Sequence, residues 1–278
     1  GTKIFTASGA GKAGTPTTIV NSSNILVGMN WPGAGSSQTN NIVVHDFILE
    51  GDHYAPGTYD IAEGGEGQAN IFVGISNGLE IYNITASKSR GDYIDFSGWG
   101  NSNAHVYNFT GINCGRNAIS FLNTTDILVE DSSWGICAYY WLDFEADNSL
   151  GGTRTTDRII IRNNTFERWD SSSSQYGGGW IALSNASSVG STNDIRIEGN
   201  RITGSHHATM QTYINQNSST RFKNISFINN SAGQTLPRTG SGNQRNFVFQ
   251  AKNIDGFVVT GNAQPGAGTA TGGYWFDP

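Results

Sequence analysis

Short segments in which apolar and polar residues alternate recur along the whole chain, and most of them end in Asn or Asp. They lie at 42–47, 79–85, 104–110, 127–133, 159–166, 195–202, 225–232 and 257–263. Their starts are 23 to 37 residues apart, and alternation with a period of two is typical of β-strands. A second set of β-prone segments falls between them, at 71–77, 93–99, 118–124, 141–147, 180–186, 210–216, 247–253 and 274–278. The pattern predicts a solenoid in which the longer coils carry inserted loops.

Asn and Asp recur where the first set of strands ends. Both residues tolerate a left-handed backbone and bond to their own turn, so a solenoid can stack them at its corners. We expect one such column, made of Asp46, Asn83, Asn108, Asp131, Asn164, Asn200, Asn230 and Asn262.

The two cysteines support this alignment of coils. Cys114 lies five residues before Ile119, and Cys137 lies five residues before Leu142. They therefore occupy equivalent points on adjacent coils, about 4.8 Å apart if the strands are in register. We expect a buried thiol pair, although this distance also permits a disulfide.

Repeats of the form apolar-x-apolar-x-Asn-x-apolar, a turn and Gly-x-apolar-x-apolar resemble the right-handed parallel β-helix of the pectin-lyase-like superfamily. The resemblance covers residues 40–278. It implies one all-β domain over residues 1–278, with about nine or ten coils and without its N-terminal cap. This superfamily hosts hydrolases, lyases, epimerases, phage tailspikes and adhesins, so the resemblance predicts the fold more sharply than the function.

Composition narrows the classes of partner. The formal net charge is −6 and the isoelectric point is near 5.3, which argues against nucleic acid, because nucleic-acid-binding domains present a basic face. The chain contains no run of 18 apolar residues, so we expect no membrane span.

Four polar insertions, at 51–70, 148–157, 170–179 and 231–245, are expected to wall a groove on one side of the solenoid.

One face of the second set of strands carries the candidate chemistry. When the apolar pairs Ile94/Phe96, Ile119/Phe121, Leu142/Phe144 and Ile181/Leu183 are aligned as inward positions, acids and aromatics fall on the opposite face. The acids are Asp95, Asp143 and Glu145, and the flanking aromatics are Tyr93, Trp141 and Trp180. We expect this outward face to form a saccharide groove.

The spacing of the acids suits glycoside hydrolysis. Asp95 and Asp143 are two coils apart, about 9.6 Å between backbones, and Asp143 and Glu145 are about 6.6 Å apart along one strand. Both are nearer to the separation of about 6.5–9.5 Å in inverting glycosidases than to the shorter one in retaining enzymes. The predicted catalytic residues are Asp143 and Glu145, with Asp95 as the alternate partner. The predicted sugar-binding residues are Trp141, Trp180, Tyr93, Tyr140, Arg90 and Arg116.

Three alternatives stay open at this stage. The acids could be solvated residues of an ordinary sheet face. A polysaccharide lyase or epimerase could use calcium held by Asp143, Glu145 and Asp147, with its base and cation drawn from Lys88, Arg90, His105, Arg116, His206 and His207. A non-catalytic adhesin or phage tail-fibre β-helix would bind carbohydrate only.

Sequence motifs do not choose among these alternatives. The chain lacks the Asp-Pro-His-Glu run of alginate epimerases and the Asn-Thr-Asp, Asp-Asp and Gly-His-Gly set of polygalacturonases.

We expect a glycoside hydrolase that needs no cofactor, with calcium as the alternative. The expected partner is a polysaccharide, the oligomeric state a monomer or homotrimer, and the location secreted or extracellular, with a virion surface as the alternative.

Overall fold

The computed structural model describes residues 17–20, 25–27, 39–51, 68–97, 100–146, 155–167, 180–184, 190–203, 212–215, 222–232, 247–252, 254–262 and 273–277. Within these ranges every regular element is a β-strand, and the strands form two sheets. No helix in this part of the chain is long and apolar enough to cross a membrane.

The larger sheet, called the long sheet below, has 13 strands. They are β1 (Thr17–Val20), β3 (Thr39–Glu50), β5 (Ser76–Ser87), β7 (Asn101–Cys114), β9 (Thr124–Glu130), β10 (Ser133–Cys137), β12 (Thr155–Arg162), β13 (Thr165–Phe166), β15 (Ser191–Glu198), β16 (Arg201–Ile202), β18 (Phe222–Ile228), β19 (Ser231–Ala232) and β21 (Ile254–Thr260).

The short sheet has nine strands. They are β2 (Ile25–Val27), β4 (Ile71–Val73), β6 (Ile94–Phe96), β8 (Ile119–Leu122), β11 (Leu142–Glu145), β14 (Ile181–Ser184), β17 (Thr212–Asn215), β20 (Phe247–Lys252) and β22 (Gly273–Asp277).

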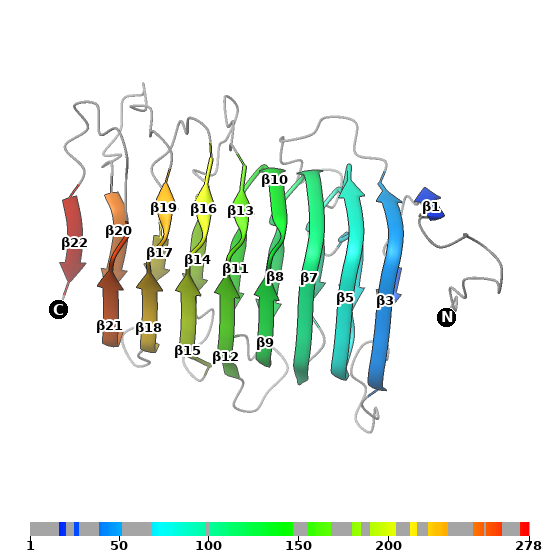
Figure 1. Cartoon of the computed structure of the whole chain (residues 1–278). Helices are drawn as coiled ribbons and strands as arrows, with labels where there is room; N and C mark the ends of the chain where they lie inside the picture. The colour runs from blue at the N-terminus through cyan, green and yellow to red at the C-terminus, as the bar shows by residue number, and fades with distance from the viewer. Residues whose placement is uncertain are drawn as a thin grey trace.

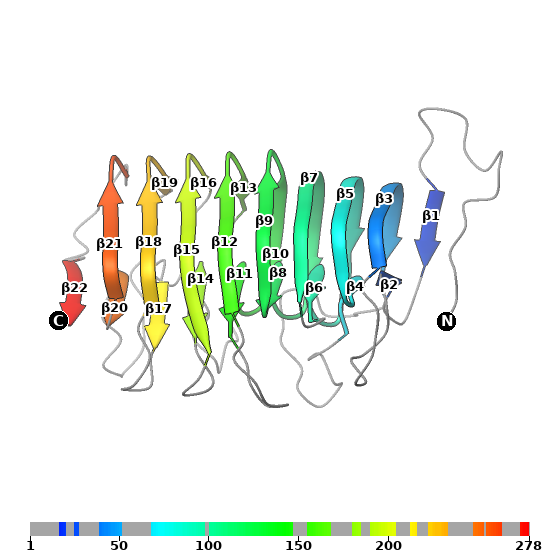
Figure 2. The ribbon, with the colours of Figure 1, turned by 90° about the horizontal axis from the view of Figure 1, so that it is seen from below.

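The two sheets are the walls of a solenoid. Strands that pair are parallel and come from successive repeats, as where Leu79 of β5 faces Ala104 of β7 and Leu142 of β11 faces Ile119 of β8. Figures 1 and 2 show the strands following one another along a single axis in chain order. The prediction of an all-β parallel solenoid is therefore confirmed. The number of coils stays a prediction, because part of the chain lies outside the described residues.

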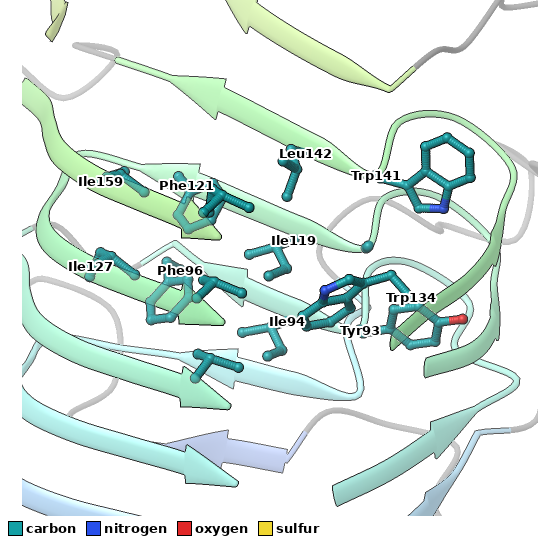
Figure 3. Packing of buried hydrophobic residues seen from close by; sticks show 14 of the residues in the cluster. Tyr93, Ile94, Phe96, Ile119, Phe121, Ile127, Trp134, Trp141, Leu142 and Ile159 are labelled. Carbon is teal, nitrogen blue, oxygen red and sulfur yellow. The ribbon is translucent and has the colours of Figure 1, made fainter. Parts of the chain in front are cut away.

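The core consists of apolar columns that run along the axis. On the short sheet, Ile94, Ile119 and Leu142 stack through consecutive register pairs and are fully buried. Phe96, Phe121 and Phe144 form a second column whose successive ring centroids are 5.7 and 4.7 Å apart. Figure 3 shows members of both columns pointing into the interior. The four inward pairs expected from the sequence are all buried, so the alternation was predicted correctly within these strands.

Two columns of left-handed residues frame the outer face of the long sheet. The first contains Asn41, Gly78, Asn103, Asp126, Arg158, Asp194, Asn224 and Gly256; the second lies five residues further on and contains Asp46, Asn83, Asn108, Asp131, Asn163, Gly199, Asn229 and Gly261. Their φ angles lie between 49° and 75°, a region that Gly, Asn and Asp enter most readily. The strands therefore bend at fixed points in every coil.

The predicted Asn column is in fact two adjacent columns. Glu130 pairs with Arg162, so Asn163 continues the left-handed column from Asp131, and Asn164 lies one residue later. Asn164 is buried and begins a separate ladder, in which Nδ2 of one Asn donates to Oδ1 of the next: to Asn200 at 3.1 Å, then to Asn230 at 3.0 Å, then to Asn262 at 2.9 Å. The doublet Asn163-Asn164 hid this shift in the sequence.

The cysteine prediction is confirmed. Cys114 and Cys137 are register partners on β7 and β10, and both are buried free thiols. The four insertions expected to wall a groove fall mostly outside the described residues, as do Asp147, His206 and His207.

Candidate active site

The predicted row of outward residues on the short sheet exists. Asp95 pairs with Ser120, Ser120 with Asp143, and Asp143 with Ala182. The exposure of this row differs from the expectation, because Asp95 and Asp143 are only 4% and 3% exposed and Ser120 is fully buried. The carboxyl groups therefore belong to a buried polar layer rather than to an open sheet face.

The prediction that the flanking aromatics point outward is wrong. Tyr93, Trp141 and Trp180 are at most 3% exposed and belong to the apolar core. Tyr93 packs against Trp134 with ring centroids 6.2 Å apart, and Trp141 and Trp180 both pack on Phe166, at 5.7 and 5.9 Å. Figure 3 shows Tyr93 beside Trp134.

The reason for this error is the position of the strand boundary. The three aromatics immediately precede the strands that start at Ile94, Leu142 and Ile181. Alternation of faces holds within a strand, whereas at the preceding bend two successive residues both face inward. These rings cannot stack on a sugar in this conformation.

Arg116 lies at the centre of the buried acids. Its Nη1 is 3.1 Å from Oδ2 of Asp92, and its Nη2 is 3.8 Å from Oδ2 of Asp143. The Arg116 side chain is only 11% exposed. Ser120 also donates from Oγ to Asp92 Oδ2 at 2.5 Å. One guanidinium is therefore shared by two carboxyl groups from different coils.

Asn117 links the same acids through its backbone and its amide. Its backbone N–H donates to Asp92 Oδ1 at 2.9 Å, and its Nδ2 donates to Asp143 Oδ2 at 3.1 Å. Its Oδ1 accepts the backbone N–H of Tyr140 at 3.0 Å. We call Asp92, Asp95, Arg116, Asn117, Ser120 and Asp143 the acid cluster.

Burial raises the pKa of every acid in this cluster. For Asp95, burial and the nearby Asp92 raise the pKa to about 7, against a hydrogen bond from Ser97 Oγ that favours the ionised form. For Asp143, burial and then the Glu145 carboxylate raise the pKa well above the ordinary value, although Arg116 opposes them. The pKa of Asp92 is raised by burial against the opposing effects of Arg116, Ser120 and Asn117.

The charge count explains these directions. The cluster buries three carboxyl groups beside one guanidinium, which contacts Asp92 and Asp143, and removing an unpaired charge from water is costly. Burial on its own would lower the pKa of Arg116, but the surrounding carboxyl groups, led by Asp92 and Asp143, together outweigh it and raise that pKa. The cluster therefore keeps at least one carboxyl group protonated near neutral pH, as a proton donor requires.

The other predicted site residues lie at the border of the cluster or elsewhere. Glu145 and Arg90 are half-buried, and Tyr140 is buried. Lys88 contacts Glu50 of β3 at 2.5 Å, and His105 contacts Glu130 on the long sheet at 2.8 Å. The structure thus brings together Asp95, Asp143 and Arg116 and separates them from Lys88 and His105.

The sequence interpretation missed Asp92 and Asn117 as members of the site. Each stands two residues before the first residue of a strand, as Tyr140 does, and their backbones follow one another in adjacent turns. A column of turn residues aligned on Ile94 and Ile119 would have revealed them. Within the described residues, no group of three or more His, Cys, Asp or Glu is placed to hold a metal ion.

Comparison with known proteins gives a fold and no family assignment. No protein-family model matches the chain, and no curated protein matches it. The chain is similar to the crystal structure of PfbA, a surface adhesin of Streptococcus pneumoniae, with a TM-score of 0.52 at 14% identity, over 89% of this chain and 70% of the adhesin. The shared feature is the fold, a parallel β-helix.

Two enzymes give weaker matches. The exopolygalacturonase of Thermotoga maritima has a TM-score of 0.48 at 10% identity, over 80% of this chain and 61% of the enzyme. The polygalacturonase of Erwinia carotovora has a TM-score of 0.35 at 11% identity, over 93% of this chain and 84% of the enzyme.

Proposed function

We propose that the protein is an extracellular carbohydrate-active β-helix that hydrolyses glycosidic bonds of a polysaccharide at the acid cluster. The observation that carries the proposal is the set of buried carboxyl groups with raised pKa values on the outward row of the short sheet. The β-helix fold supports it as an analogy only, because the superfamily that the sequence resembles includes hydrolases.

The proposed chemistry needs one neutral and one ionised carboxyl group. Asp143 or Asp95, kept protonated by burial, donates its proton to the glycosidic oxygen as the bond to the leaving sugar breaks. A second carboxylate takes a proton from the attacking water, so the proton balance is restored after product release. Glu145 suits this second role, because it is half-buried and lies two residues from Asp143 on the same strand.

The burial of the acids sets a condition on substrate binding. Asp95 and Asp143 are almost fully buried in this structure, so a glycan contacts Glu145 first and reaches the acids only when the outward face opens. Binding-induced rearrangement of this kind is common where an active site must exclude water. The four acids Asp92, Asp95, Asp143 and Glu145 outnumber the one cation Arg116 in this group, which favours a neutral glycan over a polyuronate.

The test is reducing-end release from a panel of neutral and acidic polysaccharides, with ultraviolet absorbance of unsaturated sugar ends followed in parallel. Asp143→Asn and Asp95→Asn should lower hydrolysis by about 10²–10⁴-fold, the usual contribution of an acid or base. The matched control is Asp126→Asn, which removes an acid from the exposed face of the long sheet. Equal loss in the control and the cluster variants, each still folded, would contradict the proposal.

Carbohydrate binding without catalysis is the second candidate, and the burial of the acids favours it. A buried cluster of this kind can have a purely structural role, in which it holds adjacent coils together. The similar PfbA structure is that of a surface adhesin. Glycan binding with no product from any substrate would favour this function. Unsaturated ends that disappear with a calcium chelator would instead indicate a calcium-dependent lyase.

A further inference from the structure

A hollow of about 320 Å³ lies on the outer face of the long sheet, on a different sheet from the acid cluster. It crosses the three neighbouring strands β12, β15 and β18. Each strand contributes one residue of the first left-handed column and the outward residue two positions later: Arg158 and Ile160, Asp194 and Arg196, Asn224 and Ser226.

The sequence makes the hollow by placing a short side chain in a row of longer ones. Ser226 stands in register between Arg196 and Val258, and Val258 is 46% exposed. Ile160, half-buried, supplies an apolar surface in the same row. The hollow therefore combines an aliphatic floor with a polar rim, the composition typical of small-ligand sites.

The polar rim is held in place before any ligand arrives. Arg158 contacts both carboxyl oxygens of Asp126, from Nε at 2.6 Å and from Nη2 at 2.7 Å. Arg196 Nε donates to Glu198 at 2.7 Å, and Asn224 Nδ2 donates to Asp194 Oδ1 at 2.7 Å. Side chains fixed in this way lose little conformational entropy on binding.

The charge around the hollow indicates the class of ligand. The charged residues that line it are Arg158, Arg196 and Asp194. Arg158 is paired with Asp126 and Asp157, and Arg196 is paired with Glu198. Both arginines are therefore already neutralised by carboxylates, which disfavours an anion. We infer that the hollow binds a neutral polyol ring, such as a hexopyranose unit of an oligosaccharide, with a C–H face on Ile160 and hydroxyl groups at the rim.

Methyl NMR of isoleucine-labelled protein tests this inference, with Ile160 as the reporter, assigned through Ile160→Val. The probes are cellopentaose and laminaripentaose as neutral ligands and pentagalacturonate as the anionic one. We expect a neutral pentasaccharide to shift the Ile160 methyl signal at millimolar concentration, and pentagalacturonate to leave it unchanged. A stronger response to pentagalacturonate, or no response to either neutral probe, would overturn the inference.

Two pairs of matched variants localise the binding. Ser226→Leu fills the hollow, and Thr260→Leu places the same side chain on the exposed outward row of β21, away from it. Asn224→Gly removes the side-chain amide from the rim, at a left-handed position where Gly is well tolerated. Its control, Asn229→Gly, makes the same substitution at the other left-handed position of that coil.

We expect Ser226→Leu and Asn224→Gly to weaken binding at least about tenfold, and both controls to bind as wild type. Asp95→Asn should also bind as wild type, because the hollow and the acid cluster lie on different sheets. Binding at the hollow is therefore tested independently of the proposed hydrolysis. Equal binding by Ser226→Leu and wild type would overturn the inference.

Discussion

Acids on the outer face of the long sheet and acids of the acid cluster have mostly opposite pKa shifts; the exception is Asp157 of β12, whose pKa burial raises although Arg158 opposes it. On the long sheet, hydrogen bonds from Arg158 lower the pKa of Asp126. Partial burial would raise the pKa of Glu130, but bonds from Arg162 and His105 outweigh it and lower that pKa. In the acid cluster, burial raises the pKa of Asp92, Asp95 and Asp143.

The difference lies in exposure to solvent. Arg158 contacts Asp126 and Asp157 in a solvent-exposed setting, whereas Arg116 contacts Asp92 and Asp143 in a buried one. An ion pair at the surface costs little desolvation, and a buried one must offset a large desolvation penalty. Asp126 and Glu130 on the long sheet therefore stay ionised to lower pH than the buried acids of the acid cluster.

Removing the central arginine should have the largest effect. Arg116→Met leaves Asp92 and Asp143 buried without a cation, so we expect the free energy of unfolding at neutral pH to fall by about 3–5 kcal/mol. The equivalent change on the long sheet, Arg162→Met, should cost at most about 1 kcal/mol, because solvent screens its pair with Glu130. Urea denaturation of both variants measures the contrast, and equal losses would contradict it.

The contribution of Asp95 to stability should fall as pH rises, which is the opposite of the behaviour of an acid with a lowered pKa. The pKa of Asp95 is about 7 in the folded protein and about 3.9 in an unfolded chain, so the folded state binds the extra proton between these values. The Asp95 contribution to stability is therefore fully present at low pH and is lost as pH rises towards 7. Asp95→Asn imitates the protonated form and should remove this loss, which is on the order of 4 kcal/mol at most.

Denaturation of Asp95→Asn and wild type across the range from pH 4 to pH 8 checks this prediction. Asp126→Asn is the control, because the lowered pKa of Asp126 gives the opposite sign: its contribution is present above the unfolded value and is lost as pH falls. A stability of wild type that rises steadily towards pH 8, unchanged by Asp95→Asn, would contradict the assignment.

The contrast between buried and exposed positions should also hold for neutral side chains, with smaller changes in stability. Asn200 is buried, and its Nδ2 donates to Ile161 O at 2.9 Å while its Oδ1 accepts from Asn164. Asn200→Ala leaves these groups unpaired, at a cost of about 1–3 kcal/mol. Asn229→Gly, at an exposed left-handed position, should change the melting temperature little. Thermal unfolding of the two variants separates the buried ladder from the exposed column.

The substitution Arg158→Asn should change stability the least. Arg158 is the one residue of the first left-handed column, within the described coils, that is not Asn, Asp or Gly. Arg158→Asn gives up exposed ion pairs worth about 0–1 kcal/mol and removes backbone strain of about 1–2 kcal/mol. We expect unchanged or slightly higher stability in urea denaturation. A loss well above 1 kcal/mol would show that the pairs with Asp126 and Asp157 matter more than the strain.

Much of the fold could be predicted from the sequence, because local alternation and turn residues encode it. Ile94/Phe96 and Leu142/Phe144 alternate within strands, and the stack of Asp95, Ser120 and Asp143 follows from aligning them. Two features could not be predicted in this way. The inward direction of Trp141 depends on where β11 begins, and the burial of Asp143 depends on contacts with Arg116 and Asn117 from another coil.

The proposed chemistry requires the acid cluster to hold a proton at neutral pH. Carbon-13 NMR of the Asp side-chain carboxyl signals, recorded as a pH titration of wild type and Asp95→Asn, measures it. We expect a carboxyl signal that titrates near pH 7 in wild type and disappears in Asp95→Asn. Asp carboxyl signals that all titrate below about pH 4, near the ordinary value, would contradict it.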